Sequence, residues 1–211
     1  MVLKNLKWTL LICCTVFFNC TDYNDEIKVY PIDSKLTPFL FDTGSWWAYK
    51  NTATFQTDTD MVVFAKRGYQ NAGGSGSGRF TFLAWNMVFK NLKTKKESYY
   101  IVTHGTWWYS FLEKALLVDF TNQEADSNNV NRFHRQMQLL DSMRINGRLY
   151  RNVRRVRVEE YPDSATNTYN QYFIADSIGI IRWDQYNKGV NTDSKFLIDY
   201  RIKLAPNWNS P

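Results

Sequence analysis

Residues 143–150 read Met-Arg-Ile-Asn-Gly-Arg-Leu-Tyr, an octapeptide that indicates the fold class. Asn146 and Gly147 both tolerate the positive φ angles that a two-residue type I′ turn requires, and residues compatible with β-strands flank them on both sides. A turn at this position pairs Ile145 directly with Arg148. The octapeptide therefore predicts two antiparallel strands joined by a tight hairpin.

Residues 195–204 (KFLIDYRIKL) give the clearest single strand. Apolar and polar side chains alternate along this stretch, and only Leu197 breaks the pattern. A period of two predicts a strand with one buried and one solvated face. Pro206 is expected to end it, because proline cannot donate a backbone hydrogen bond to a neighbouring strand.

Similar short runs recur about every ten residues and are separated by turn-forming residues. Aromatic residues, which favour strands, make up 17% of the chain. We expect further strands over residues 45–51, 60–69, 79–89, 99–103, 107–112, 116–120, 169–174 and 178–183. The sequence thus predicts a mainly β protein, built as a single antiparallel sandwich or as a curved sheet resembling half a barrel.

Two stretches beside the hairpin are ambiguous. Residues 128–138 fit the apolar stripe of a short helix, whereas the alternation of the following residues favours a strand after about residue 135. Beyond the hairpin, Val153 has the opposite parity to Val156 and Val158. A bulge near Arg154 and Arg155 would let all three valines reach one core.

Residues 1–19 (MVLKNLKWTLLICCTVFFN) combine two early lysines with an apolar run that ends before Asn19. This arrangement is typical of a secretory signal peptide, and the run is shorter than the roughly 20 apolar residues of a membrane-spanning helix. The cysteine that follows, Cys20, resembles the lipid-modified first residue of a bacterial lipoprotein. The usual lipoprotein pattern has leucine three residues before the cysteine and a small residue just before it, where this chain has Phe17 and Asn19. The alternative is an ordinary signal peptide, or an uncleaved anchor, with an incidental cysteine.

Cleavage before Cys20 divides the chain into a signal peptide, an acidic tether over residues 20–29, a single β-rich domain over 30–205 and a C-terminal tail over 206–211. Acyl chains on Cys20, palmitate among them, would hold the protein on the outer membrane, at its periplasmic or its cell-surface face. The mature chain keeps 24 basic and 20 acidic residues, a balance that does not indicate nucleic-acid binding. It has no cysteine after residue 20, which excludes internal disulfides and thiolate metal sites in the domain.

Three motifs carry a resemblance to a known group of proteins. They are Pro31 followed by the Gly-x-Trp-x-Tyr-like stretch 44–49, the Asn-Gly-x-x-Tyr-x-Asn-Val stretch 146–153, and the Tyr-Phe-x-Ala-x-x-x-Gly-Ile-Ile stretch 172–181. With them the chain resembles uncharacterised, membrane-anchored lipoproteins of the Bacteroidota type. The resemblance implies a β-rich mature domain behind a lipid anchor, and it implies no activity.

The chain carries no recognisable catalytic or metal-binding constellation. His104 and His134 lack partners at metal-ligand spacing, and the adjacent Glu159 and Glu160 would point to opposite faces of a strand. The arginines between residues 144 and 157 would form either an anion-binding patch or, as we favour, a solvated strand face. We therefore expect no catalytic residue, metal or cofactor.

Three aromatic doublets give the best functional lead: Trp46-Trp47, Tyr99-Tyr100 and Trp107-Trp108. Neighbours on a strand point to opposite sides of a sheet. Either both faces of the sheet are covered, or some of these rings are exposed as a ligand-binding surface.

The sequence therefore favours a non-enzymatic, lipid-anchored envelope protein that binds a glycan or an apolar ligand. The alternative is a structural or assembly lipoprotein that docks another envelope protein. A third hypothesis is a hydrolase whose acidic residues are unrecognised.

Overall fold

The computed structural model describes residues 28–32, 34–72, 80–103, 107–110, 115–119, 135–159 and 167–206. The predictions for the signal peptide, Cys20, His104, His134 and residues 207–211 lie outside these ranges. No helix among the described residues is long and apolar enough to cross a membrane.

Within the described residues, twelve strands form one sheet in the order β7-β6-β5-β4-β3-β2-β12-β11-β10-β9-β8, and β1 pairs in parallel with β4 outside this path. The strands are β1 (Lys28–Tyr30), β2 (Trp46–Asn51), β3 (Thr57–Ala72), β4 (Phe80–Asn91), β5 (Glu97–Thr103), β6 (Trp107–Ser110), β7 (Ala115–Asp119), β8 (Arg135–Ile145), β9 (Arg148–Glu159), β10 (Tyr169–Ala175), β11 (Gly179–Asn187) and β12 (Val190–Arg201). Every pairing along the path is antiparallel. The fold is mainly β, as predicted, with one large open sheet.

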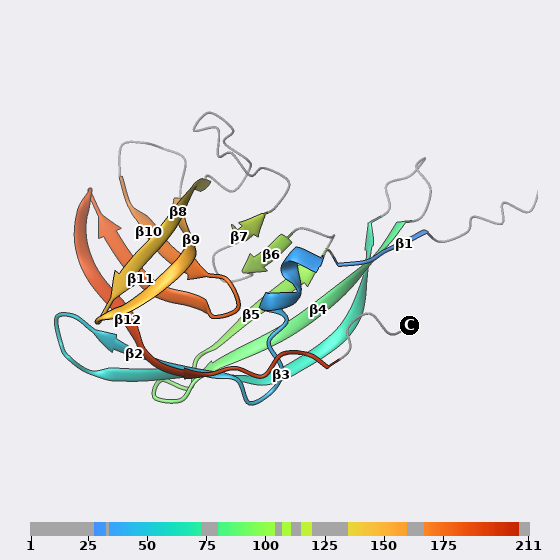
Figure 1. The fold of residues 1–211 in the computed structure, drawn as a ribbon, viewed down its shortest axis with the longest axis horizontal. Coiled ribbons are helices and arrows are strands. Elements are labelled where there is room, and N and C mark those ends of the chain that lie inside the picture. The colour runs from blue at the N-terminus through green and yellow to red at the C-terminus, as the bar shows by residue number, and fades with distance from the viewer. Residues whose placement is uncertain are drawn as a thin grey trace, which may run out of the picture.

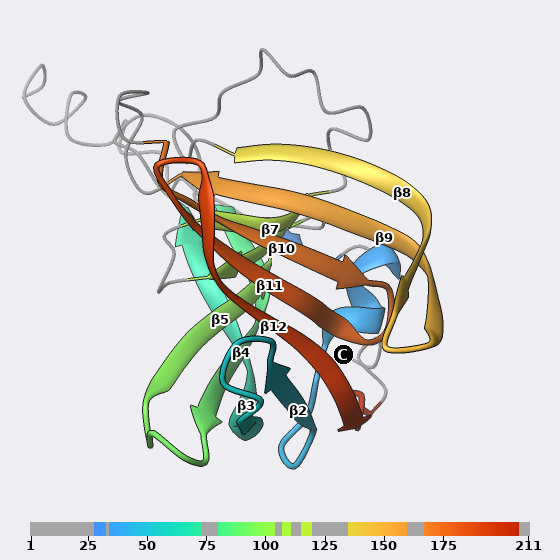
Figure 2. The same cartoon turned by 90° about the vertical axis from the view of Figure 1, so that its left-hand side faces the viewer.

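The sheet curls strongly, so that the half containing β8–β12 faces the half containing β3–β7 (Figures 1 and 2). A short 3-10 helix, η1 (Ser34–Phe39), lies between the two halves. The curved sheet, rather than the two-layer sandwich, is therefore the observed architecture. The sequence did not predict η1 or β1, but every predicted strand coincides with an observed one over the described residues.

The predicted hairpin joins β8 and β9. Asn146 and Gly147 take positive φ angles of 47° and 80°, and Ile145 pairs with Arg148. Turn chemistry alone therefore predicted the register of this hairpin correctly.

The break in alternation at Leu197 marks an irregularity in β12. The pairing of β12 with β2 shifts between Leu197 and Asp199, and Leu197 is buried opposite Tyr49. Ile198 is the extra residue at this shift. It allows Leu197 to enter the core, although strict alternation along the strand would place Leu197 on the solvated face.

Two local expectations are corrected. Strand β8 begins at Arg135, so residues 135–138 are extended and the short helix near residues 128–138 is wrong over this part; residues 128–134 lie outside the described ranges. The bulge near Arg154 and Arg155 is also wrong, because β9 stays in register with both neighbours there. The irregularity lies instead at Asn152, whose φ is 50°, immediately before Val153.

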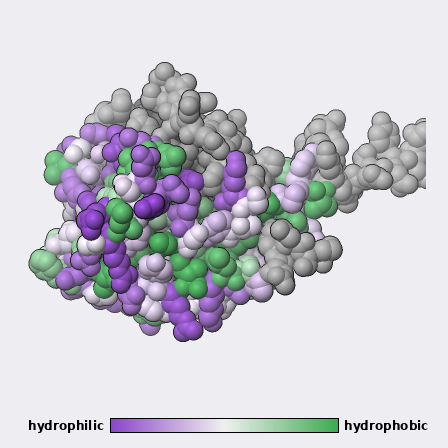
Figure 3. Space-filling model, in the orientation of Figure 1, coloured by the Kyte–Doolittle hydropathy of each residue, from purple (hydrophilic) through white to green (hydrophobic). Residues whose placement is uncertain are grey.

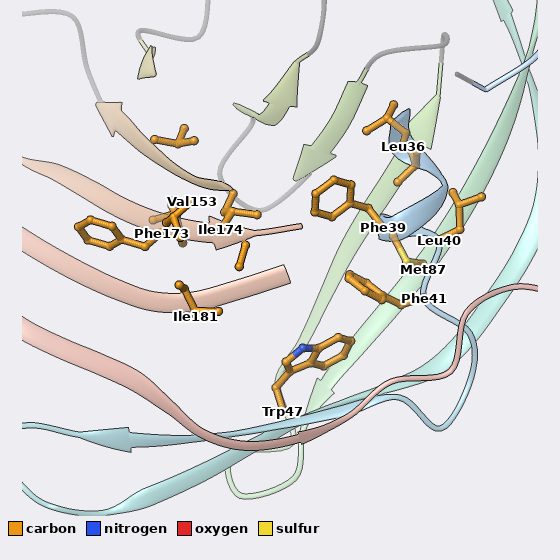
Figure 4. Close-up of a cluster of buried hydrophobic side chains, with 14 of the residues drawn as sticks. Leu36, Phe39, Leu40, Phe41, Trp47, Met87, Val153, Phe173, Ile174 and Ile181 are labelled. Carbon is orange, nitrogen blue, oxygen red and sulfur yellow. The ribbon is translucent and has the colours of Figure 1, made fainter. Parts of the chain in front are cut away.

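The N-terminal segment over residues 34–41 fills the concavity of the curled sheet. Its apolar side chains Leu36, Phe39, Leu40 and Phe41 are buried and meet residues from both halves of the sheet (Figure 4). The side chain of Arg154 lies over the Phe39 ring, 6.0 Å from its centroid, and its charge is paired with Asp176. The segment therefore provides much of the apolar surface against which the curled sheet packs.

Removing the Phe39 ring should destabilise the whole domain. Phe39 is 0% exposed, and truncation of a buried phenylalanine costs about 3–5 kcal/mol. We expect Phe39→Ala to lower the free energy of unfolding by this amount in urea denaturation. Phe55→Ala is the matched control, because Phe55 is 69% exposed and its loss should cost less than about 0.5 kcal/mol. Equal effects of the two variants would contradict the packing role of the segment.

Candidate functional site

The inner face of the sheet carries a row of polar and aromatic side chains that crosses β2, β3 and β4. Trp47 on β2 is opposite Asp60 on β3, and Asp60 is opposite Asn91 on β4. Directly opposed residues of paired strands point to the same face. The strand register therefore brings an indole, a carboxylate and an amide side by side.

Trp47 and Tyr49 connect β2 to the beginning of β11. The Trp47 Nε1 donates a hydrogen bond to the Ile178 carbonyl at 2.6 Å, and the Tyr49 hydroxyl donates to the Ile180 carbonyl at 2.8 Å. Strand β12 lies between β2 and β11 in the sheet. The two side chains thus reach across β12 on the concave side.

Aromatic rings continue the row on the other side of Trp47. The Trp47 ring stacks on Phe89 with centroids 5.2 Å apart, and Tyr100 meets Phe89 edge to face at 4.7 Å. Phe41 packs edge-on against Trp47 at 4.9 Å. Such offset and edge-on contacts are the favoured geometries of aromatic pairs, and they fix the rings in place.

A cleft of about 80 Å³ opens between these groups. Its aromatic residues are Phe41, Trp47, Tyr49, Phe89 and Tyr100, and its polar residues are Asp60, Asn91, Lys96 and Ser98; Gly179 and Ile180 form the facing wall. The cleft combines flat rings with hydrogen-bonding groups from four neighbouring strands and the loop before β5.

Asp60 is the chemically distinctive residue of the cleft. Burial raises the pKa of its carboxyl, and the charge of Asp58 adds to this, whereas the hydrogen bond from Asn91 and the charge of Lys195 oppose it. The Asn91 Nδ2 donates to the Asp60 Oδ1 at 2.9 Å. Burial also raises the pKa of Tyr49 well above its ordinary value, and the nearby Asp60 contributes. Tyr49 is therefore a neutral phenol, while Asp60 is a partly desolvated acid.

A turn motif holds Asn91 in position. The Asn91 Oδ1 accepts hydrogen bonds from the backbone N–H groups of Lys93 and Thr94, and Lys95 closes the turn with a φ of 64°. This side-chain capping of the turn leaves the Asn91 amide nitrogen to hold Asp60.

The turn between β2 and β3 repeats this arrangement. The Asn51 Oδ1 accepts from Ala53 and Thr54, Phe55 has a φ of 56°, and the Asn51 Nδ2 donates to Asp193. Both turns share the sequence pattern Asn-x-x-Thr, over residues 51–54 and 91–94. An asparagine that caps its turn and fixes a carboxylate is thus a repeated element of this fold.

The predicted aromatic doublets separate as strand geometry requires. Trp47 is 2% exposed and Trp46 is partly exposed, whereas Tyr100 lines the cleft and Tyr99, 52% exposed, hydrogen-bonds Glu97. Trp107 and Trp108 pair with Thr103 and Val102, and their side chains lie outside the described part. The structure therefore brings Trp47 and Tyr100 to one cleft, while Tyr99 points away from it.

Of the residues that line the cleft, sequence reasoning identified Trp47 and Tyr100 and missed the others, among them Tyr49, Asp60, Phe89 and Asn91. Tyr49 shares the parity of Trp47, so the strand pattern contained a signal for it. Asp60 and Asn91 were not recognisable, because their contact depends on the register of strands that are 31 residues apart in sequence.

The basic run between residues 144 and 157 does not form one patch. Arg154 is buried and paired with Asp176, and Arg157 lies over the Tyr169 ring at 3.8 Å. The remaining arginines, Arg144, Arg148, Arg151 and Arg155, are exposed on the hairpin. No cluster of three or more potential metal ligands occurs among the described residues.

Comparison with known proteins finds neither a matching family model nor a matching curated protein. Among solved structures, the chain is similar to a "putative lipoprotein" of Parabacteroides distasonis, with 14% identity over 77% of this chain and 98% of that one and a TM-score of 0.43. It is also similar to a "putative exported protein with YmcC-like fold" of Bacteroides fragilis, with 13% identity over 77% of this chain and 99% of that one and a TM-score of 0.42. Both neighbours come from the Bacteroidota. Likeness of this degree assigns neither a family nor a function to this chain.

The pH dependence of stability should report on Asp60. Its pKa in the folded state lies above the ordinary value of 3.8, so between these two pKa values the folded chain binds more protons than the unfolded chain. The contribution of Asp60 to stability therefore falls as pH rises from 3.8 through the raised pKa. Asp60→Asn should remove this loss, so the urea midpoint of the variant should rise relative to that of the wild type as pH increases through this window.

Asp141→Asn provides the control, because Asp141 is an exposed carboxylate on β8. This variant should keep the wild-type pH profile of the urea midpoint. A wild-type profile in Asp60→Asn would show that the Asp60 carboxyl is not desolvated in the folded protein.

Proposed function

We propose that this chain is an exported, lipid-anchored envelope protein whose β-domain binds a saccharide in the cleft of Trp47, Asp60 and Tyr100. The observation that supports the proposal is the cleft itself, where aromatic rings flank a desolvated carboxylate and an oriented amide. Sugars present apolar C–H faces beside hydroxyl groups. Aromatic rings can pack against the C–H faces, and Asp60 and Asn91 can form hydrogen bonds with the hydroxyl groups.

The size of the cleft sets the mode of binding. At about 80 Å³ it is well below the roughly 300–1,000 Å³ of sites that enclose a whole small molecule. It admits one edge of a terminal sugar ring and leaves the rest of the glycan in solvent. Binding to a single sugar should accordingly be weak, with a Kd of about 1 mM.

An apolar chain is the less suitable ligand. The concavity that would hold it is filled by Phe39, Leu40 and Phe41 of the N-terminal segment. The opening beside this segment is lined by a carboxylate, an amide and a lysine. Burying an alkyl chain against such groups would desolvate them without giving them new partners.

The face of the molecule drawn in Figure 3 also gives less support to a flat docking role. On the face shown in Figure 3, hydrophobic residues occur in small groups separated by hydrophilic ones. Docking surfaces of soluble domains are marked by larger continuous apolar patches. The saccharide-binding function is therefore preferred over the assembly function.

The Tyr99-Tyr100 doublet offers a matched test of saccharide binding. Saturation-transfer NMR and tryptophan fluorescence would be measured with glucose, galactose, mannose and N-acetylglucosamine. At least one sugar should bind the wild type saturably, and Tyr100→Ala should weaken its binding about tenfold, equivalent to 1.4 kcal/mol. Tyr99→Ala should bind like the wild type, because Tyr99 points away from the cleft.

Three results would count against the proposal: no saturable binding of any of these sugars, equal losses in both tyrosine variants, or a dependence on Tyr99 alone. Circular dichroism of each variant would verify that its fold is retained. Cleavage of a glycosidic bond in matching disaccharides, lost in Asp60→Asn, would replace the binding function by the hydrolase hypothesis.

Support for the location comes from the N-terminal sequence. The signal-like residues 1–19 are followed directly by Cys20, the last cysteine of the chain. Acylation at Cys20 with palmitate among its chains would anchor the protein to the outer membrane, since two or more acyl chains hold a protein stably. The acidic stretch between Cys20 and β1 would then separate the domain from the membrane.

Lipid attachment is testable by metabolic labelling with alkyne-tagged palmitate. The wild-type protein should carry the label and fractionate with outer membranes, and Cys20→Ala should carry none. Cys13→Ala is the matched control, because Cys13 lies inside the apolar run of the signal, and it should remain labelled. Label retained in Cys20→Ala would overturn the anchor assignment.

A further inference from the structure

A second, larger pocket lies where the tip of the β8–β9 hairpin meets β11 and β12. It has about 200 Å³ of room. The polar residues around it are Thr52, Arg144, Asn146, Arg182, Ser194 and Lys195, and Ile145 and Phe196 add an apolar part. Arg144 and Asn146 come from the hairpin tip, whereas Arg182, Ser194 and Lys195 come from the body of the sheet.

Two basic residues of the pocket, Arg182 and Lys195, are paired with aspartates. The Arg182 Nε donates to both oxygens of Asp184, at 2.9 and 3.0 Å, and the Lys195 Nζ donates to Asp58 at 2.9 Å. Neither aspartate lines the pocket. The pocket itself therefore contains hydrogen-bond donors and no carboxylate.

Donor groups remain available on both sides of the pocket. Within the described residues, the Nη atoms of Arg182 and the side-chain amide of Asn146 have no hydrogen-bond partner, and Arg144 uses one Nη to reach the Gly147 carbonyl at 3.0 Å. Arg144 is exposed, and none of the described acidic residues forms an ion pair with it. The two guanidinium groups are donors only, and the Asn146 amide adds an N–H donor group beside its acceptor oxygen.

The Arg182 guanidinium is held in place before any ligand binds. Its Nε is fixed by Asp184, whose side chain is 1% exposed, and its Cζ lies over the Phe173 ring, 5.5 Å from the centroid. A guanidinium fixed in this way presents its remaining N–H groups with little further loss of entropy. Fixed donors of this kind suit a ligand with several acceptor oxygens.

We propose that this pocket binds a compact oxyanion, a phosphate monoester or a carboxylate, between Arg144 and Asn146 on the hairpin and Arg182 on β11. The proposal is independent of the saccharide cleft, because the pocket shares none of the residues that line the cleft. The two neutralised ion pairs leave Arg144 as the main uncompensated charge. Affinity should therefore be moderate and should decrease as salt concentration rises.

Isothermal titration with inorganic phosphate, at constant ionic strength and with chloride as the reference anion, tests the proposal. The wild type should bind phosphate saturably, and Arg144→Gln should weaken binding about tenfold, as expected for a lost hydrogen bond to a charged group. Arg151→Gln is the matched control: Arg151 is exposed on the same hairpin but does not line the pocket. This control should bind within about twofold of the wild type.

Arg182→Lys provides a second variant, since it keeps the positive charge beside the buried Asp184 and loses the planar fork. It should also weaken phosphate binding while leaving the thermal unfolding midpoint close to that of the wild type. Absence of saturable phosphate binding, or equal losses in Arg144→Gln and Arg151→Gln, would overturn the proposal.

Further titrations distinguish the sources of the anion. Glucose 1-phosphate and glucuronate would be compared with phosphatidylcholine vesicles containing phosphatidate. Arg144-dependent binding of the soluble compounds supports a sugar-borne anion, and Arg144-dependent binding of the vesicles supports a lipid headgroup. If Arg144→Gln bound the soluble compounds or the vesicles as tightly as the wild type, the result would count against binding in this pocket.

Discussion

The side chain of Trp47 holds together three parts of the molecule that lie far apart in the sequence. Its Nε1 donates to the Ile178 carbonyl, 131 residues later, and its ring packs against Phe41 of the N-terminal segment and Phe89 of β4. Since β12 separates β2 from β11 in the sheet, these contacts require the sheet to curl. A buried N–H without a partner costs about 1–3 kcal/mol, so the hydrogen bond and the packing stabilise the same curled geometry.

The cleft follows from that curl and from the length of the N-terminal segment. In a flatter sheet Gly179 and Ile180 would lie away from Tyr49, and the cleft would have no second wall. The filling segment ends at Phe41, which is also a cleft residue. Beyond Phe41, Asp60 and Asn91 replace apolar side chains on the inner face. The cleft is therefore the place where the interior of the sheet changes from apolar to polar.

The parts of the fold that depend on local chemistry were predictable from the sequence. The Asn146-Gly147 turn predicted the pairing of Ile145 with Arg148 because a two-residue turn fixes the register. The segment around Phe39 was not predictable, since a six-residue 3-10 helix has too few turns to show an apolar period. Its position inside the sheet depends on contacts with both halves, and these contacts form only in the complete fold.

The doublet Tyr99-Tyr100 explains why aromatic patterns alone are a weak guide to sites in such a sheet. Any two adjacent residues on a strand lie on opposite faces, so a doublet places one ring inward wherever it occurs. Tyr100 differs from other inward rings in that it lines a cleft together with a desolvated carboxylate. Burying Asp60 opposes folding above its ordinary pKa, whereas an apolar residue there would not. A costly polar group among well-packed rings is thus a more specific indication of function than the rings themselves.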